Sequence, residues 1–208
     1  MGAHFPSLEE LKATGLYSRL LEFGRERSFE EGHALRVTAL SLGLFDQLAP
    51  VHGMGERERK LLFSAAMLHD VGMCRGMRGH HKSSLDIILA GDLQPLTDRE
   101  RRMVASIARY HRKAHPRRRH DHFSALRDED QQAVSKASSL LRIADALDRA
   151  HDGAVDGLEA EISARKVVIR ARAARELGFE EQAVRRKGRL FEELFGRRLA
   201  LKAVRPEG

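Results

Sequence analysis

The stretch Leu61-Leu-Phe-Ser-Ala-Ala-Met-Leu-His-Asp-Val-Gly72 decides the fold of this 208-residue chain. It completes a predicted helix that begins near Glu56 and ends at Leu68. The apolar stripe of this helix is unusually rich, with Leu61, Leu62, Ala65, Ala66 and Leu68. We therefore place the helix at the centre of a bundle, with His69 and Asp70 at its C-terminal end.

Other helices are predicted on both sides of this central one. Capping-box patterns begin at Ser7, Ser28 and Thr97, where a hydroxyl and a glutamate three residues later can satisfy free amides at a helix start. Helical patterns follow from residue 28 to Pro50 and over residues 82–90, 98–111 and 130–150. We expect residues 1–150 to form an all-helical domain.

The predicted secondary structure changes near residue 151. Two Asp-Gly turn signals precede a predicted hairpin of residues 158–162 and 167–171, and a helix is predicted over 179–195. An alternating stretch at 199–204 gives a further strand. The fold class is therefore mainly α, with a small α+β appendage over residues 151–208 that holds about three short strands and one helix.

Composition limits the cellular setting and the kind of partner. Hydrophobic residues make up 42% and charged residues 32%, which is typical of a folded soluble chain. A single cysteine excludes an internal disulfide, and neither a signal peptide nor a stretch of membrane-spanning length is recognisable, so we expect a cytoplasmic protein with no membrane partner. The 37 Lys and Arg residues exceed the 30 Asp and Glu residues, giving a net charge of +7 that favours a phosphorylated small molecule or polyphosphate. Aromatic residues are only 5% and no nucleic-acid recognition motif is present, which argues against a nucleic-acid partner. The sequence leaves open whether the chain forms a homodimer.

Four residues are candidates for a metal site. His69 and Asp70 end an apolar helix, where a divalent cation would compensate their buried polar groups. The alternative is that His69 meets the negative end of the helix dipole, with Asp70 as a local cap. His33 and Asp145 each lie beside the apolar face of their predicted helix, although Asp145 can instead pair with Arg142 or Arg149.

Together His33, His69-Asp70 and Asp145 resemble, in order and spacing, the four-ligand signature of the HD-domain metal-dependent phosphohydrolase superfamily. The resemblance implies an HD-type helical bundle that binds a divalent metal ion such as Mn, Mg, Fe, Co, Ni or Zn. The segments around His80-His81 and His111 look like those that add a second metal in some members, including the HD-GYP type. By that register His81 and His111 are the ligands and His80 is the spare. The GYP segment is absent, and Tyr110 stands where a paired histidine often stands.

A narrower resemblance covers residues 33–196. Ala65-Ala-Met-Leu-His-Asp-Val-Gly72, Ala108-Arg-Tyr-His-Arg-Lys113, Leu141-Arg-Ile-Ala-Asp-Ala-Leu-Asp148 and Phe191-Glu-Glu-Leu-Phe-Gly196 are similar to the C-terminal region of the exopolyphosphatase/guanosine-pentaphosphate phosphatase (Ppx/GppA) family. In that family, polyphosphate is cleaved by N-terminal actin-like domains, for which this chain has no room. The resemblance alone therefore does not imply exopolyphosphatase activity.

These residues favour a metal-dependent phosphohydrolase that acts on a phosphomonoester, nucleotide or phosphodiester. Asp70 and His111 are the predicted catalytic residues, with Asp70 able to bridge two metal ions. Lys82, Arg112 and Lys113 would neutralise charge on the phosphoryl oxygens.

Blander alternatives remain open. The histidines at 81 and 111 can simply belong to a basic phosphate-binding surface, and residues 109–119 can be a solvated loop. The whole chain can be a non-catalytic regulatory or polyphosphate-binding module. His4, His52, Cys74 and His151 are expected to be structural or incidental, and residues 185–187 a solvated helix face.

Overall fold

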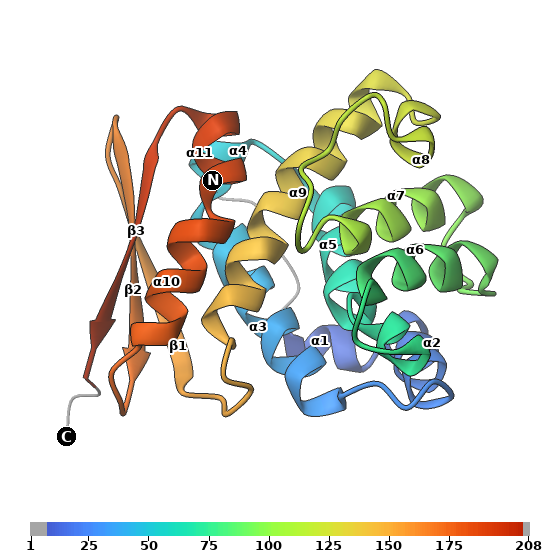
Figure 1. The fold of residues 1–208 in the computed structure, drawn as a ribbon, viewed down its shortest axis with the longest axis horizontal. Helices are drawn as coiled ribbons and strands as arrows, with labels where there is room; N and C mark the ends of the chain where they lie inside the picture. Colours follow the sequence, from blue (N-terminus) through green and yellow to red (C-terminus); the bar gives the residue numbers. More distant parts are fainter. Residues whose placement is uncertain (1–7, 206–208) are drawn as a thin grey trace.

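The central helix α5 (Glu56–Leu68) has the predicted bounds and is buried along its C-terminal half. The computed structural model describes residues 8–205, so the patterns at His4 and Ser7 lie outside the described residues (Figure 1). Around α5 pack α2 (Gly15–Arg25), α3 (Glu31–Gln47), α7 (Asp98–Arg109) and α9 (Asp128–Leu147). The remaining helical elements of this part are α1 (Leu8–Lys12), α4 (Ala49–His52), the 3₁₀ turn η1 (Val71–Arg75), α6 (His80–Ala90) and α8 (Asp121–Ser124).

Two of the three capping patterns can be checked against helix starts. Thr97 forms the expected box at α7: its hydroxyl accepts from the Glu100 amide at 3.2 Å, and the Thr97 amide donates to Glu100 at 2.9 Å. The prediction at Ser28 is wrong, because α3 starts three residues later at Glu31. Ser28 lies in the turn between α2 and α3 with a φ of 51°, so it cannot occupy an N-cap.

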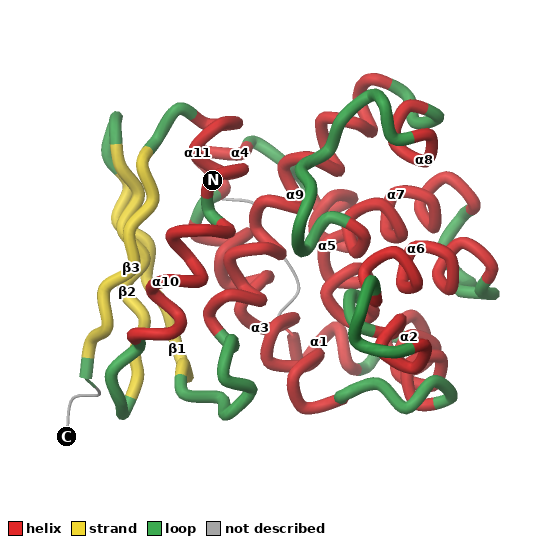
Figure 2. Tube along the Cα trace, in the orientation of Figure 1, coloured by secondary structure: helices red, strands yellow, loops and turns green. Residues whose placement is uncertain are grey.

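The C-terminal residues form a three-stranded sheet at one side of the molecule (Figure 2). β1 (Val155–Ile162) and β2 (Lys166–Ala173) make the predicted antiparallel hairpin, with Ala160 opposite Ile169. β3 (Arg198–Val204) then pairs with β2 in parallel, placing Leu201 beside Ile169. A parallel partner needs a crossover, which the intervening helical segment supplies.

The crossover consists of two helices where one was predicted. α10 (Gly178–Lys187) and α11 (Arg189–Phe195) meet at Gly188, whose missing side chain lets Leu199 approach closely: a Cβ there would lie 2.6 Å from Leu199 Cδ2. α10 lies between the sheet and α9, and it contacts both (Figure 1).

One apolar core runs through the helical bundle and the C-terminal sheet. The same cluster of buried residues includes Leu62 of α5, Leu141 of α9, Ile169 of β2 and Phe191 of α11. The secondary structure changes at the predicted division near residue 150, and residues on both sides of it belong to this cluster. Among the helices described, none combines the length and apolarity needed to cross a bilayer.

Candidate metal centre

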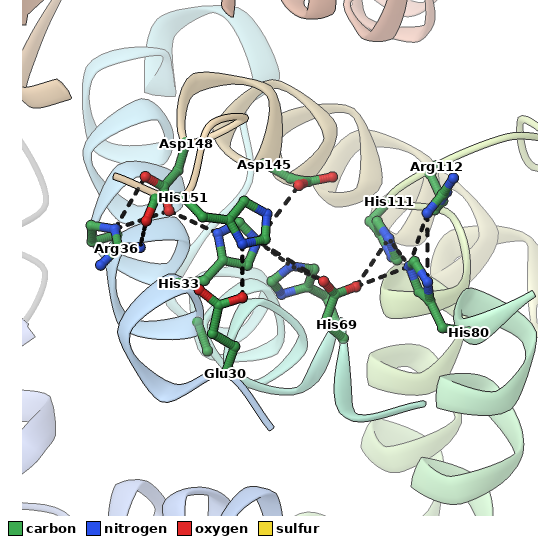
Figure 3. Close-up of polar contacts among 12 residues, drawn as sticks. Glu30, His33, Arg36, His69, His80, His111, Arg112, Asp145, Asp148 and His151 are labelled. Carbon is green, nitrogen blue, oxygen red and sulfur yellow. Dashed lines mark hydrogen bonds and ion pairs between the residues drawn. The ribbon is translucent and has the colours of Figure 1, made fainter. Parts of the chain in front are cut away.

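Five helices bring histidine and aspartate side chains to one point in the bundle (Figure 3). His33 lies in the first turns of α3, His69 caps the C-terminus of α5, and Asp70 follows it. His80 begins α6, His111 follows α7, and Asp145 lies in the last turn of α9. The ends of these helices therefore meet where their last or first turns leave the apolar core.

Asp70 stands between two pairs of histidines. Its Oδ2 lies 4.0 Å from Nε2 of His33 and 3.7 Å from Nε2 of His69. Its Oδ1 lies 3.1 Å from Nε2 of His80 and 3.4 Å from Nε2 of His111. Each triplet of side chains offers ligand atoms close enough together to hold one metal ion, and Asp70 belongs to both triplets.

Backbone carbonyls fix three of these imidazoles in the same tautomer. The Nδ1 atoms of His69, His80 and His111 lie 2.7 to 2.9 Å from the carbonyl oxygens of residues 66, 77 and 108. A carbonyl only accepts, so each Nδ1 must donate its hydrogen, and a neutral ring then carries a lone pair at Nε2. These lone pairs all point toward Asp70.

Without a cation between them, the facing nitrogens are unfavourably close to each other. Nε2 of His33 lies 3.3 Å from Nε2 of His69, and Nε2 of His80 lies 3.2 Å from Nε2 of His111. Oδ1 of Asp70 is buried and receives no well-formed hydrogen bond within the described structure. Each pair of facing nitrogens lies beside one carboxylate oxygen of Asp70, and such a donor set suits a divalent metal. The residues therefore fit the cation that the sequence predicts.

Electrostatics keep these groups in ligand form. Burial lowers the pKa values of His69 and His111, which favours their neutral imidazoles. Burial opposes the charge on Asp70, but His69, His80 and His111 outweigh burial and hold the pKa of Asp70 well below its usual range. Metal ligands must be deprotonated, so the balance at these three residues, His69, His111 and Asp70, is the one that a metal site requires.

His33 is oriented by a carboxylate that the sequence analysis did not single out. Its Nδ1 lies 2.7 Å from Oδ2 of Asp148, and Nε of Arg36 donates to the same oxygen at 2.9 Å. Burial opposes a proton on His33, but the hydrogen bond that His33 donates to Asp148 and the charges of Asp145 and Asp70 raise its pKa. Carboxylate–histidine pairs of this kind commonly orient metal ligands. Asp148 follows Asp145 by three residues, at the C-terminal cap of the same helix, and this spacing was the only signal in the sequence.

The structure changes the register at the second histidine pair. His80 faces Asp70, whereas His81 is buried elsewhere and its Nδ1 has no hydrogen-bond partner among the described residues. α6 starts at His80 rather than near residue 82, so the two neighbouring rings leave the helix about 100° apart and only one can face the cluster. Burial, followed by the charge of Arg109, lowers the pKa of His81 to about 4.

Asp145 also has an unexpected partner. Its Oδ1 lies 3.7 Å from Nε2 of His33, but Oδ2 forms an ion pair with Lys187 of α10. Neither Arg142 nor Arg149 takes this position, and Lys187 is buried rather than part of a solvated face. The guanidinium of Arg142 instead donates to backbone carbonyls, including that of Tyr110 at 2.8 Å.

A cleft of about 550 Å³ opens beside the cluster, and one wall is strongly basic. Of the predicted phosphate-binding residues, Arg112 and Lys113 line this cleft, and Arg112 approaches Nε2 of His80 at 3.3 Å. Lys82 is exposed and lies outside the lining. Sequence reasoning missed the other basic lining residues, which come from two helices and the loop between β1 and α9: Arg142, Arg149, Arg186 and Lys187.

Two histidines set aside as structural differ in position. His52 is structural: its Nε2 donates to the Phe45 carbonyl at 2.7 Å and its Nδ1 accepts from the Met54 amide. His151 instead lines the cleft and stacks on His33 with ring centroids 3.7 Å apart. Its Nδ1 lies 2.8 Å from Glu30, which holds the ring over the cluster.

Comparison with known proteins gives one family. A scan against protein-family models matches residues 21–191 to Ppx/GppA phosphatase, domain III. The match covers more than four fifths of the chain and includes every side chain of the cluster. A search of the curated proteins finds no match.

Proposed function

This chain belongs to the Ppx/GppA phosphatase family, whose domain III it matches, and from that premise we propose that it is a metal-dependent phosphohydrolase of the HD type. Its substrate would be a phosphomonoester, a nucleotide or a phosphodiester. The observation that carries the proposal is the pair of facing Nε2 contacts around Asp70, because a divalent cation on each side would satisfy every one of those donor atoms.

The ligand assignment follows from these contacts. His33, His69 and Asp70 would hold one cation, with Oδ1 of Asp145 as a further ligand on the same side. Asp70, His80 and His111 would hold a second, with His80 in the role first expected of His81. When bound, such cations polarise phosphoryl oxygens and make a water molecule nucleophilic near neutral pH.

The protein's own residues would bind and orient the substrate. Arg112 and Lys113 lie at the His80 side of the cleft, where they can pair with phosphoryl oxygens that develop negative charge. His111 is fixed through Ala108 and needs no rearrangement to face the reacting group. Because its Nε2 would bind the cation, His111 would act as a ligand that is already in position, without a cost of reorganisation.

Metal content provides the first test. We expect the purified protein to contain or take up a divalent metal, and Asp70→Asn to abolish that uptake because Asp70 is shared by both triplets. His115→Gln is the matched control, since His115 pairs with Glu193 away from the cluster. If Asp70→Asn contains as much metal as the unmodified chain, Asp70 is not part of the metal site.

Activity provides the second test. Nucleotides, phosphomonoesters and cyclic dinucleotides are incubated with Mn²⁺ and the protein, alongside a polyphosphate ladder. We expect turnover of at least one small phosphorylated compound, lost in Asp70→Asn and kept in His115→Gln. A protein that binds metal but hydrolyses nothing in the panel contradicts the enzymatic proposal.

A non-catalytic, polyphosphate-binding module is the second candidate. The basic wall of the cleft favours it, because four arginines and two lysines line a surface on which a polyanion can bind without reacting. Such binding would weaken steeply with salt. Retention of the polymer without shortening, together with an inactive panel, would select this function.

A further inference from the structure

One lysine of the C-terminal unit enters the metal centre. Lys187 is 8% exposed and its Nζ pairs with Oδ2 of Asp145, while the other oxygen of that carboxylate faces Nε2 of His33. The neighbouring Arg185 and Arg186 are exposed. The ion pair therefore connects α10 to the cluster through a single buried cation.

The backbone around Lys187 is fixed from both sides. Its carbonyl accepts a hydrogen bond from Nε of Arg142 at 3.2 Å, which ties the end of α10 to α9. The next residue is Gly188, where the chain turns into α11 against Leu199. The ammonium group, by contrast, sits on four rotatable bonds and lines the cleft, so it can change partners while its backbone stays in place.

We propose that Lys187 and the divalent cation compete for Asp145, and that a phosphate group in the cleft relieves the competition by drawing the ammonium to its own oxygens. The proposal rests on the metal site proposed above. The ammonium of Lys187 on Oδ2 and a divalent cation at Oδ1 of the same buried carboxylate would repel each other, since charges in a poorly solvated site are weakly screened. A phosphate oxyanion offers Lys187 an alternative partner in the same cleft, beside Arg112 and Arg142.

The consequence is that metal and phosphate bind cooperatively. In the free protein, Lys187 neutralises Asp145 and weakens the cation on the His33 side. With phosphate bound, Asp145 is released to that cation, so each ligand strengthens the other. Lys187 would thus make tight metal binding at this position depend on the presence of a phosphorylated ligand.

Calorimetric titration of the full chain, stripped of metal with a chelator, tests the proposal. Mn²⁺ is titrated into the unmodified protein, Lys187→Met and the control Arg185→Met, each with and without inorganic phosphate. We expect Lys187→Met to bind Mn²⁺ about tenfold more tightly than the unmodified chain in the absence of phosphate, because a competing charge is gone. Phosphate should then raise Mn²⁺ affinity less in Lys187→Met than in the other two proteins.

Thermal unfolding adds a readout independent of metal affinity. Without metal, Lys187→Met leaves Oδ2 of Asp145 buried without its cationic partner, so the melting temperature should fall, and Mn²⁺ should restore most of the loss. Arg185→Met should follow the unmodified protein throughout. If Lys187→Met does not fold, Lys187→Gln keeps a hydrogen bond to Asp145 while removing the charge.

The outcomes separate the two proposals. If the unmodified chain binds no Mn²⁺ with or without phosphate, the metal-dependent function fails. If it binds Mn²⁺ but the lysine variant binds it equally or more weakly, Lys187 does not compete for Asp145 and is only an anchor for α10. Equal phosphate enhancement in all three proteins overturns the part assigned to phosphate.

Discussion

Each imidazole in the cluster has one nitrogen engaged before any ligand arrives. Carbonyl oxygens hold Nδ1 of His69, His80 and His111, whereas a carboxylate holds Nδ1 of His33. The difference matters because Asp148 also accepts a hydrogen bond from Arg36, so the orientation of the Asp148 carboxylate depends on α3 as well as α9. At the scale of single residues, His33 is thus the ligand whose geometry rests most on another side chain.

Replacing the carboxylate of Asp148 should weaken metal binding without removing a metal ligand. Asp148→Asn keeps the size of the side chain but loses the charge that orients His33, and we expect metal affinity to fall about 10- to 100-fold. Titration with Mn²⁺ measures the effect, and Asp152→Asn, at an aspartate that pairs with Arg175, is the control. An unchanged affinity would mean that the charge of Asp148 is not needed to orient His33.

His122, a histidine away from the cluster, should make the stability of the folded protein fall at acid pH. Burial, followed by the charge of Arg109, lowers the pKa of His122 to about 4. The unfolded chain then takes up a proton near pH 6.5, before the folded chain does, so stability is complete above that pH and declines as pH falls toward 4. His122→Asn should flatten the melting temperature between pH 6.5 and 4 relative to the unmodified protein. An identical slope in the variant would show that other groups set this limb.

At the scale of elements, η1 and α6 approach each other more closely than a side chain would allow. A Cβ on Gly72 would lie 2.2 Å from the carbonyl oxygen of His80 and 2.4 Å from the amide nitrogen of Ser84. The Ser84 hydroxyl further ties the two segments, donating to the His69 carbonyl at 2.7 Å and accepting from the Gly72 amide at 2.9 Å. This contact sets the position of His80 relative to His69.

Gly72→Ala should therefore damage both stability and metal binding. The clash is with backbone, so α6 must shift, at a cost of about 1–3 kcal/mol or more. Chemical denaturation measures the stability, and elemental analysis measures the loss of metal at the His80 side. Gly15→Ala is the control, because a Cβ there meets nothing within 4 Å.

The elements that sequence could predict are those whose signals are local. The bounds of α5 and the box at Thr97 follow from nearby residues, as does the hairpin of β1 and β2. The break at Gly188 depends on Leu199, and the choice of His80 over His81 depends on where α6 begins. Lys187 reaches Asp145 only through the packing of α10 on α9. Tertiary packing, which the sequence pattern does not carry, decided these three.

At the scale of the whole molecule, the C-terminal unit and the bundle depend on each other. α9 is buried over most of its length and packs against α10, so removing residues after 150 would expose apolar surface of α9 to water. We expect a fragment of residues 1–150 to show no cooperative thermal transition, measured by circular dichroism. A fragment that melts cooperatively would establish the two parts as independent domains.

The two partners of the Asp145–Lys187 ion pair are synthesised at different times. The two residues are 42 positions apart, so at typical translation rates Lys187 leaves the peptidyl-transferase centre on the order of 2 to 8 s after Asp145. His33, His69, His80 and His111 all precede both. During that interval the nascent chain holds every proposed ligand and lacks the lysine. Because residues 1–150 are not expected to fold without α10, the ligands and the lysine come together only when the whole chain folds, and the competition for Asp145 begins as the site forms.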